Sequence, residues 1–310
     1  MNPVPYIQIA RVDHWVKNIF ILPGMVLGLF FGGGAGGMSD VLRIALGLLA
    51  ACLVASANYV VNEIMDAPQD RFHPEKQARP IPSGRVNLRW AWAEWAGLSL
   101  LGGALGFGIG RPFGWTLSLL WLMGMLYNIE PFRTKKYPYV DVLSEAVNNP
   151  IRLALGWYLV GGRAVPPVSI IVAYWMFGAF LMATKRFAEY RQINDPPRAA
   201  RYRESFAYYN EERLLGSLLF YGSLFAMMSG TFIMRYHIEL ILASPLIAWA
   251  MAYYLHLGFA PDSPAQRPEL LFRNGRLMLL VGAAFLACTV LLFVHLPRFG
   301  EWFNPWLVPS

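Results

Sequence analysis

Long hydrophobic stretches separated by short polar segments run along almost the whole chain. Nine of them are long enough to cross a bilayer as helices, which takes about 17–25 residues. They are Trp15–Phe31, Val41–Val61, Trp90–Gly108, Phe113–Ile129, Val140–Val160, Val168–Ala183, Leu214–Met234, Ile238–Leu257 and Leu277–Leu296. The pattern predicts an all-α, polytopic membrane protein that forms a single transmembrane domain over residues 1–310.

The composition supports a membrane location. Hydrophobic residues make up 56% of the chain, charged residues 15%, and the mean hydropathy is +0.40, whereas soluble domains are about 45–50% apolar and about 25% charged. Cys52 and Cys288 both lie inside hydrophobic stretches, which favours neither a disulfide nor a metal site. The first residues lack the features of a cleavable signal peptide, so we expect them in the mature protein.

The positions of the basic residues predict the orientation. With a cytosolic N-terminus, most of the 26 Lys and Arg residues lie in the N-terminal arm or in the cytosolic connections 62–89, 130–139, 184–213 and 258–276. Few fall on the other side: Arg43, Arg111, Arg163, Arg235 and Arg298. This asymmetry follows the positive-inside rule. The net charge of +7 therefore indicates topology rather than nucleic-acid binding, and we expect a bacterial inner-membrane protein.

The polar segment after the second stretch carries the strongest chemical signal. Asn62, Asp66 and Asp70 are spaced at i, i+4 and i+8, which places them on one helix face. Pro68 predicts that the helix ends near Asp66, with Asp70 in the first turn of the loop. Two carboxylates and an amide oxygen form a partial Mg²⁺ shell that a diphosphate would complete. We therefore interpret these three residues as metal-binding and catalytic.

A basic set follows the aspartates directly. It consists of Arg71, His73, Lys76 and Arg79. These side chains, on a loop stiffened by proline and glycine, favour anion binding next to the metal. The alternative is a solvated helix end at which Asp66 and Asp70 pair with these cations. The long loops 62–89 and 184–213 are both predicted to be catalytic and cytosolic.

At these residues the chain resembles a known family. The pattern N-x-x-x-D-x-x-x-D, followed by R-x-H-P-x-K-x-x-R-P-I-x-S-G-x-V, is similar to the first signature of the UbiA superfamily of intramembrane prenyltransferases. The resemblance implies nine transmembrane helices around a central cavity. Glu63 stands where the family usually has aspartate. Further positions that resemble the family are Trp15-Val16-Lys17-Asn18, Tyr127, Arg133, Lys135 and Arg152-Leu-Ala-Leu-Gly156.

The second motif of this superfamily is usually rich in aspartate, and here the sequence departs from it. Its counterpart is T-K-R-F-A-E-Y-R-Q-I-N-D, in which Lys185, Arg186 and Arg191 surround Glu189. A basic cluster opposite an acidic one suits a substrate with an additional phosphate. K-R-x-A-E and R-E-S-F-A-Y-Y-N-E-E-R-L are similar to the branch that uses phosphoribosyl diphosphate (PRPP). Positive-inside anchoring is the alternative for Lys185 and Arg186.

The resemblance implies Mg²⁺-dependent transfer of 5-phosphoribose from PRPP to a polyprenyl phosphate, releasing diphosphate. The candidate substrate-binding residues are Lys17, Arg71, Lys76, Arg79, Tyr127, Arg152, Lys185, Arg186 and Glu189. The expected partners are a polyprenyl phosphate, a soluble diphosphate and membrane lipids, with no nucleic acid and with a homo-oligomer left open. The alternatives are prenyl transfer to an aromatic or quinone-precursor acceptor, and a transporter or lipid-binding protein.

Overall fold

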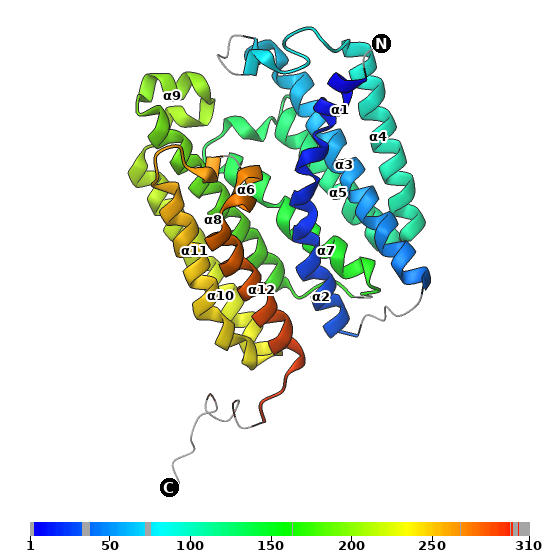
Figure 1. Ribbon diagram of the computed structural model, residues 1–310, viewed down its shortest axis with the longest axis vertical. Helices are drawn as coiled ribbons and strands as arrows, with labels where there is room; N and C mark the ends of the chain where they lie inside the picture. Colours follow the sequence, from blue (N-terminus) through cyan, green and yellow to red (C-terminus); the bar gives the residue numbers. More distant parts are fainter. Residues whose placement is uncertain are drawn as a thin grey trace.

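A computed structural model describes residues 3–32, 38–71, 76–162, 164–266 and 268–297, together with Phe299 and Phe303. The described residues form helices and no strand (Figure 1). The α-helices are α1 (Val4–Ala10), α2 (Leu22–Phe30), α3 (Met38–Asp70), α4 (Leu88–Ile109), α5 (Arg111–Asn128), α6 (Val140–Ala146), α7 (Asn148–Leu159), α8 (Val168–Ile193), α9 (Pro196–Tyr202), α10 (Glu211–Tyr236), α11 (Ser244–Gly258) and α12 (Gly275–Phe293).

Short 3₁₀ helices connect several of these elements. They are η1 (Val12–Ile21), η2 (Lys76–Ala78), η3 (Thr134–Lys136), η4 (Glu204–Ala207), η5 (Ile238–Ala243), η6 (Pro264–Gln266) and η7 (Pro268–Arg273). Two of them matter for the site, because η3 follows α5 and contacts η4, which follows α9. The segments that lead into α6 and α10 are therefore in contact with each other.

The helices form two groups that stand side by side (Figure 1). In one group α3 packs against α4 and α5, and α2 packs against α7. In the other, α8 packs along α10, with α11 and α12 beside them. Contacts of α7 with α8 and of α2 with α12 join the groups. Each group has a hydrophobic core of its own, and a further core packs Leu27 and Trp157 of the first group against Phe232 and Leu292 of the second.

Helical structure occupies most of each predicted span, which confirms a polytopic, all-helical chain. Among the described residues, five helices are long and apolar enough to cross a membrane: Ser39–Asp70, Val168–Ile193, Glu211–Tyr236, Ile238–Gly258 and Gly275–Phe293. The first predicted span is instead η1 followed by α2, and the fifth is α6 followed by α7. Nine crossings and a cytosolic N-terminus therefore stay predictions.

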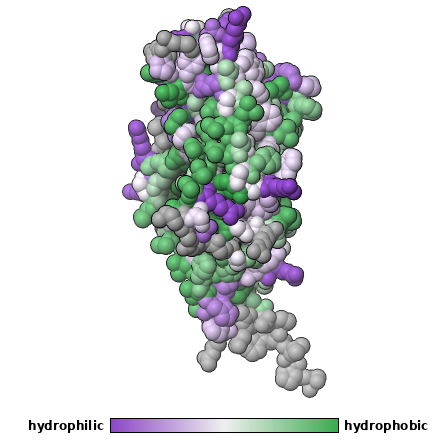
Figure 2. Space-filling view, turned by 90° about the vertical axis from the view of Figure 1, so that its right-hand side faces the viewer, coloured by the Kyte–Doolittle hydropathy of each residue, from purple (hydrophilic) through white to green (hydrophobic). Residues whose placement is uncertain are grey.

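Large hydrophobic side chains cover much of the outer surface, as a lipid-facing surface requires. Leu100 of α4 and Leu219 of α10 are each 74% exposed, and Leu279 of α12 is 73% exposed. Figure 2 shows hydrophobic residues over much of one face, with hydrophilic residues toward its ends and in smaller patches between them. In water such a surface would be costly, whereas in hydrocarbon it is not.

The prediction that α3 ends near Asp66 is wrong. The helix continues through Pro68 to Asp70, and the backbone N–H of Arg71 still bonds to the carbonyl of Ala67 at 3.2 Å. Proline removes only its own N–H from the helical pattern, and at the last turn this loss is small enough for the helix to continue. Asn62, Asp66 and Asp70 therefore share one continuous helix.

Candidate active site

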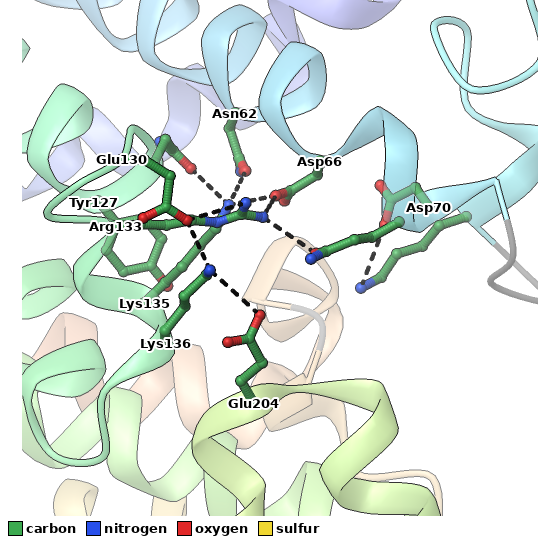
Figure 3. A network of polar contacts seen from close by, with 12 residues as sticks. Asn62, Asp66, Asp70, Tyr127, Glu130, Arg133, Lys135, Lys136 and Glu204 are labelled. Carbon is green, nitrogen blue, oxygen red and sulfur yellow. Dashed lines mark hydrogen bonds and ion pairs between the residues drawn. The ribbon is translucent and has the colours of Figure 1, made fainter.

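Asn62 and Asp66 point from α3 toward residues that follow α5, whereas Asp70, one turn further along, contacts the loop after α3 (Figure 3). The i, i+4, i+8 spacing on a continuous helix brings all three to one helix face, as predicted. Asp70 is buried, and the side chain of Asp66 is 21% exposed. Two carboxylates in such surroundings need cations nearby, because an isolated buried charge is costly.

Glu63, on another side of α3, has a structural role. Its Oε1 accepts a hydrogen bond from the backbone N–H of Ile81 at 3.1 Å, and Nη2 of Arg11 lies 4.0 Å from its Oε2. The carboxylate, 2% exposed, thus fastens the loop after α3 to the helix itself. This contact fixes the position of the basic residues that the loop carries.

Asp70 pairs with two of those basic residues. Nη1 of Arg79 lies 2.7 Å from its Oδ2, and Nζ of Lys76 lies 4.0 Å from its Oδ1. For Asp70 the structure therefore shows the pairing that the sequence left as an alternative. Arg71 is exposed at the end of α3, and His73 lies outside the described residues.

Asp66 pairs instead with cations from the segment after α5. Arg133 donates to its Oδ1 at 3.1 Å, and the ammonium of Lys135 contacts the same oxygen. Nζ of Lys135 also lies 3.0 Å from Oδ1 of Asn128 and 3.5 Å from Oδ1 of Asn62. Figure 3 shows these oxygens converging on one ammonium group. The sequence had placed Lys135 only by its resemblance to the family.

The oxygens around the Lys135 ammonium indicate whether these residues could bind a metal ion. One carboxylate oxygen and two amide oxygens already surround a cation, the Lys135 ammonium, and oxygen donors of this kind suit Mg²⁺. Among the described residues no group of three His, Cys, Asp or Glu could hold a metal ion. The residues thus fit an incomplete magnesium shell that needs oxygens from water and substrate.

Burial changes the pKa values of two lysines in this region. It lowers the pKa of Lys135 below the ordinary lysine value, and the contact with Asp66 opposes that shift. Burial also lowers the pKa of Lys76; Asp70 opposes this shift, and the charge of Arg203 adds to it. A bound anion would stabilise the charged form of both lysines. We call Asn62, Asp66, Asp70, Lys76, Arg79, Arg133 and Lys135 the α3 cluster.

Arg186 of α8 is the centre of a second polar network. Its Nε lies 3.0 Å from Oδ2 of Asp141, its Nη1 3.1 Å from Oε2 of Glu189, and its Nη2 3.4 Å from the Tyr127 hydroxyl. Lys185, one residue earlier, lies 3.9 Å from Oε1 of Glu189. The structure thus brings the predicted residues Tyr127, Lys185, Arg186 and Glu189 together, with Arg186 tied to protein partners.

Asp141 anchors this network and was missed from the sequence. It is fully buried, and it accepts hydrogen bonds from the hydroxyls of Tyr209 at 2.7 Å and Ser205 at 3.2 Å. An aspartate inside a predicted span was the available signal, because such charges are rare unless paired. Through it, α6, α8 and the segment after α9 are fixed to one another.

Arg203 lies between α9 and η4, next to this network. It is partly buried, and its guanidinium carbon lies 5.8 Å from the centre of the Phe206 ring. Its Nε is buried and has no hydrogen-bond partner among the described residues. We call Tyr127, Asp141, Lys185, Arg186, Glu189, Arg203, Ser205 and Tyr209 the α8 cluster.

Lys17 and Arg152, both predicted to bind substrate, contact residues of η1 and α3. Nε of Arg152 donates to Oδ1 of Asn18 at 3.0 Å. Nζ of Lys17 lies 5.5 Å from the centre of the Tyr59 ring. His14 packs against the same ring, with centroids 5.2 Å apart, and this contact fits a structural role better than that of a base.

Comparisons with known proteins give a consistent result. A sequence profile described as the UbiA prenyltransferase family matches residues 20–275. A decaprenyl-phosphate phosphoribosyltransferase of Corynebacterium glutamicum is 26% identical over 190 residues, which are 59% of this chain and 54% of the relative. A 4-hydroxybenzoate octaprenyltransferase of Aeromonas salmonicida is 28% identical over 180 residues, 58% of each chain. The similarity thus spans about half the length of these relatives.

Solved structures share the fold. A UbiA homolog from Archaeoglobus fulgidus, bound to DMAPP and Mg²⁺, has a TM-score of 0.69 at 22% identity and covers 92% of this chain and 99% of that chain. A digeranylgeranylglyceryl phosphate synthase structure has a TM-score of 0.64 at 17% identity, covering 94% and 98%. At these identities the likeness concerns the arrangement of helices.

Proposed function

This chain belongs to the UbiA prenyltransferase family, and from that premise we propose that it transfers 5-phosphoribose from PRPP to a polyprenyl phosphate. The products are polyprenylphosphoryl-5-phosphoribose, a lipid-linked pentose donor, and diphosphate. The metal is Mg²⁺, and the site faces the cytosol from a bacterial inner membrane. This proposal goes beyond the family, whose members include prenyl transfer enzymes.

One observation carries the choice of PRPP: positive charge exceeds negative charge across the two clusters. Each carboxylate has at least one cationic partner, and Asp66 and Asp70 each have two. Arg203 adds a further cation without an ion pair to any described carboxylate. PRPP carries a diphosphate and a separate phosphate, so it needs more cations than a prenyl diphosphate does. Relatives named decaprenyl-phosphate phosphoribosyltransferase add support.

The chemistry follows from the charges. The bond between C1 of ribose and the diphosphate breaks, its electron pair leaves with the diphosphate, and a phosphate oxygen of the lipid bonds to C1. Asn62, Asp66 and Asp70 would hold Mg²⁺, which when bound neutralises the leaving diphosphate. Lys76, Arg79 and Lys135 place further positive charge beside it.

The acceptor needs binding rather than activation. A lipid phosphate is already ionised at neutral pH, so its oxygen can attack without a strong general base. Lys17 of η1 and Arg152, which donates to the neighbouring Asn18, are the candidates to bind it. Catalysis then rests on orientation and on stabilisation of charge.

A prenyltransferase acting on an aromatic or quinone-precursor acceptor is the second candidate. It is favoured by relatives named 4-hydroxybenzoate octaprenyltransferase at similar identity. The α3 cluster would serve that reaction equally well, because the metal and diphosphate are common to both. The α8 cluster separates the two candidates.

A paired assay tests the choice. Purified protein with Mg²⁺ is given radiolabelled PRPP and decaprenyl phosphate, and in parallel octaprenyl diphosphate and 4-hydroxybenzoate. We expect a labelled lipid and stoichiometric diphosphate only in the first assay. Product only in the second would replace phosphoribosyl transfer with prenyl transfer. Product in neither, across several polyprenyl lengths, would contradict both.

A further inference from the structure

The α8 cluster must contain a cation that is free to bind substrate, and Arg186 does not meet that condition. Its guanidinium contacts Asp141, Glu189 and Tyr127, and the arginine is 2% exposed. Taking Arg186 to a substrate phosphate would leave two buried carboxylates without their main partner, which is costly. Arg186 is better described as a residue that positions the others.

Arg203, unlike Arg186, has a guanidinium that is not bound to carboxylates of the described residues. Its side chain forms no hydrogen bond or ion pair with any described residue, and its guanidinium approaches the Phe206 ring. A guanidinium has five N–H donors in a planar fork that matches a phosphate group. A partly buried arginine with unused donors, in a cluster of charged residues, is suited to an anionic ligand.

The backbone around Arg203 is held firmly. Its N–H bonds to the carbonyl of Ala199 at 3.0 Å, and its carbonyl accepts from the N–H of Phe206 at 2.9 Å. Two residues later, the Ser205 hydroxyl bonds to buried Asp141. Phe206 is itself buried. Arg203 therefore extends from a fixed base, which reduces the entropy lost when it binds a ligand.

Arg203 also faces the α3 cluster. Its positive charge acts on Lys76 and Lys135, which belong to the loops after α3 and α5. Nζ of Lys76 lies 4.7 Å from the ring centre of Tyr202, the neighbour of Arg203. The contact between η3 and η4 likewise brings the segment that begins after Arg203 next to Lys135.

We propose that Arg203 binds the phosphate on C5 of PRPP and is the residue that selects PRPP over diphosphates lacking that phosphate. The inference rests on the proposed phosphoribosyl transfer. The α3 cluster binds the diphosphate end, Arg203 with Lys185 binds the other end, and the ribose lies between them. Arg186 and Asp141 keep this second site in place.

The test compares two ligands in binding rather than turnover. Dissociation constants for PRPP and for inorganic pyrophosphate, each with Mg²⁺, are measured by calorimetry on the full-length protein in detergent. Arg203→Gln should weaken PRPP binding about ten- to hundredfold, the range for a charge-assisted hydrogen bond. Pyrophosphate binding should stay within about twofold, because it uses the α3 cluster. Arg203→Lys should restore part of the PRPP affinity.

Arg201→Gln is the matched control, because Arg201 is exposed on α9 two residues away. It should leave both constants unchanged. Equal weakening of both ligands by Arg203→Gln, or an unchanged preference for PRPP, would overturn the role of Arg203 while leaving phosphoribosyl transfer intact. A wild-type protein that binds pyrophosphate but shows no preference for PRPP would overturn the proposed function and this inference together.

Discussion

The α3 and α8 clusters both combine acidic and basic side chains, but they use them in opposite ways. In the α3 cluster the carboxylates lie on one face of a helix, and the basic residues that pair with them belong to the loops after α3 and α5. In the α8 cluster the buried carboxylate of Asp141 forms an ion pair with Arg186. The first arrangement can exchange its partners for metal and substrate. The second is a scaffold that leaves Arg203 available.

The largest effect should come from the α3 cluster. Asp66→Asn removes a carboxylate that would bind Mg²⁺ and leaves Arg133 and Lys135 without their shared partner. We expect turnover to fall about 10³-fold, comparable to losing a principal electrostatic contact in a transition state. Initial rates of labelled-lipid formation measure this. Glu212→Gln, at an exposed position in the first turn of α10, is the control, and equal rates for both variants would contradict a metal role.

The next effect concerns stability and belongs to the α8 cluster. Asp141→Ala leaves Arg186 buried without its main partner and removes the acceptor of Tyr209 and Ser205. Breaking a buried ion pair from one side costs about 3–5 kcal/mol, so the thermal unfolding midpoint in detergent should fall by several degrees. Asp70→Asn, whose partners come from a surface loop, should change it less. A reversed order would remove the distinction between the clusters.

The exchange of partners in the α3 cluster can be tested with metal alone. The Lys135 ammonium lies among the oxygens of Asn62, Asp66 and Asn128, so it competes with a divalent cation for them. Lys135→Met should tighten Mn²⁺ binding about tenfold without substrate, measured by electron paramagnetic resonance. Lys136→Met, which breaks pairs with Glu130 and Glu204 but touches none of those three oxygens, should have no effect. Weaker Mn²⁺ binding by Lys135→Met would show that the lysine supports the shell.

The sequence predicted the α3 cluster better than the α8 cluster for a physical reason. Asn62, Asp66 and Asp70 are neighbours on one helix, so spacing alone places them together. The partners of Arg186 come from α5, α6 and α8, and Asp141 is bonded in turn by the segment after α9. No local pattern brings these together. The helical spans were likewise predictable from hydrophobic runs. The continuation of α3 through Pro68 was not, because a proline in the last turn removes one backbone donor without having to end the helix.

The smallest expected effect on stability comes from Lys136→Ala, which breaks a surface ion pair. Glu130 and Lys136 form an exposed pair at 2.7 Å beside the α3 cluster, and the hydrogen bond from Lys136 lowers the pKa of Glu130. A carboxyl with a lowered pKa in the folded state adds stability above its ordinary pKa and loses it as the pH falls through the folded value. Because water screens both groups, Lys136→Ala should barely shift the unfolding midpoint at pH 7. Any remaining difference from the wild type should vanish once the pH falls below the lowered folded-state pKa of Glu130. If Lys136→Ala shifted the midpoint as much as Asp141→Ala does, the buried pair Asp141–Arg186 would contribute no more stability than the surface pair Glu130–Lys136. The contrast between the clusters would then need a cause other than burial.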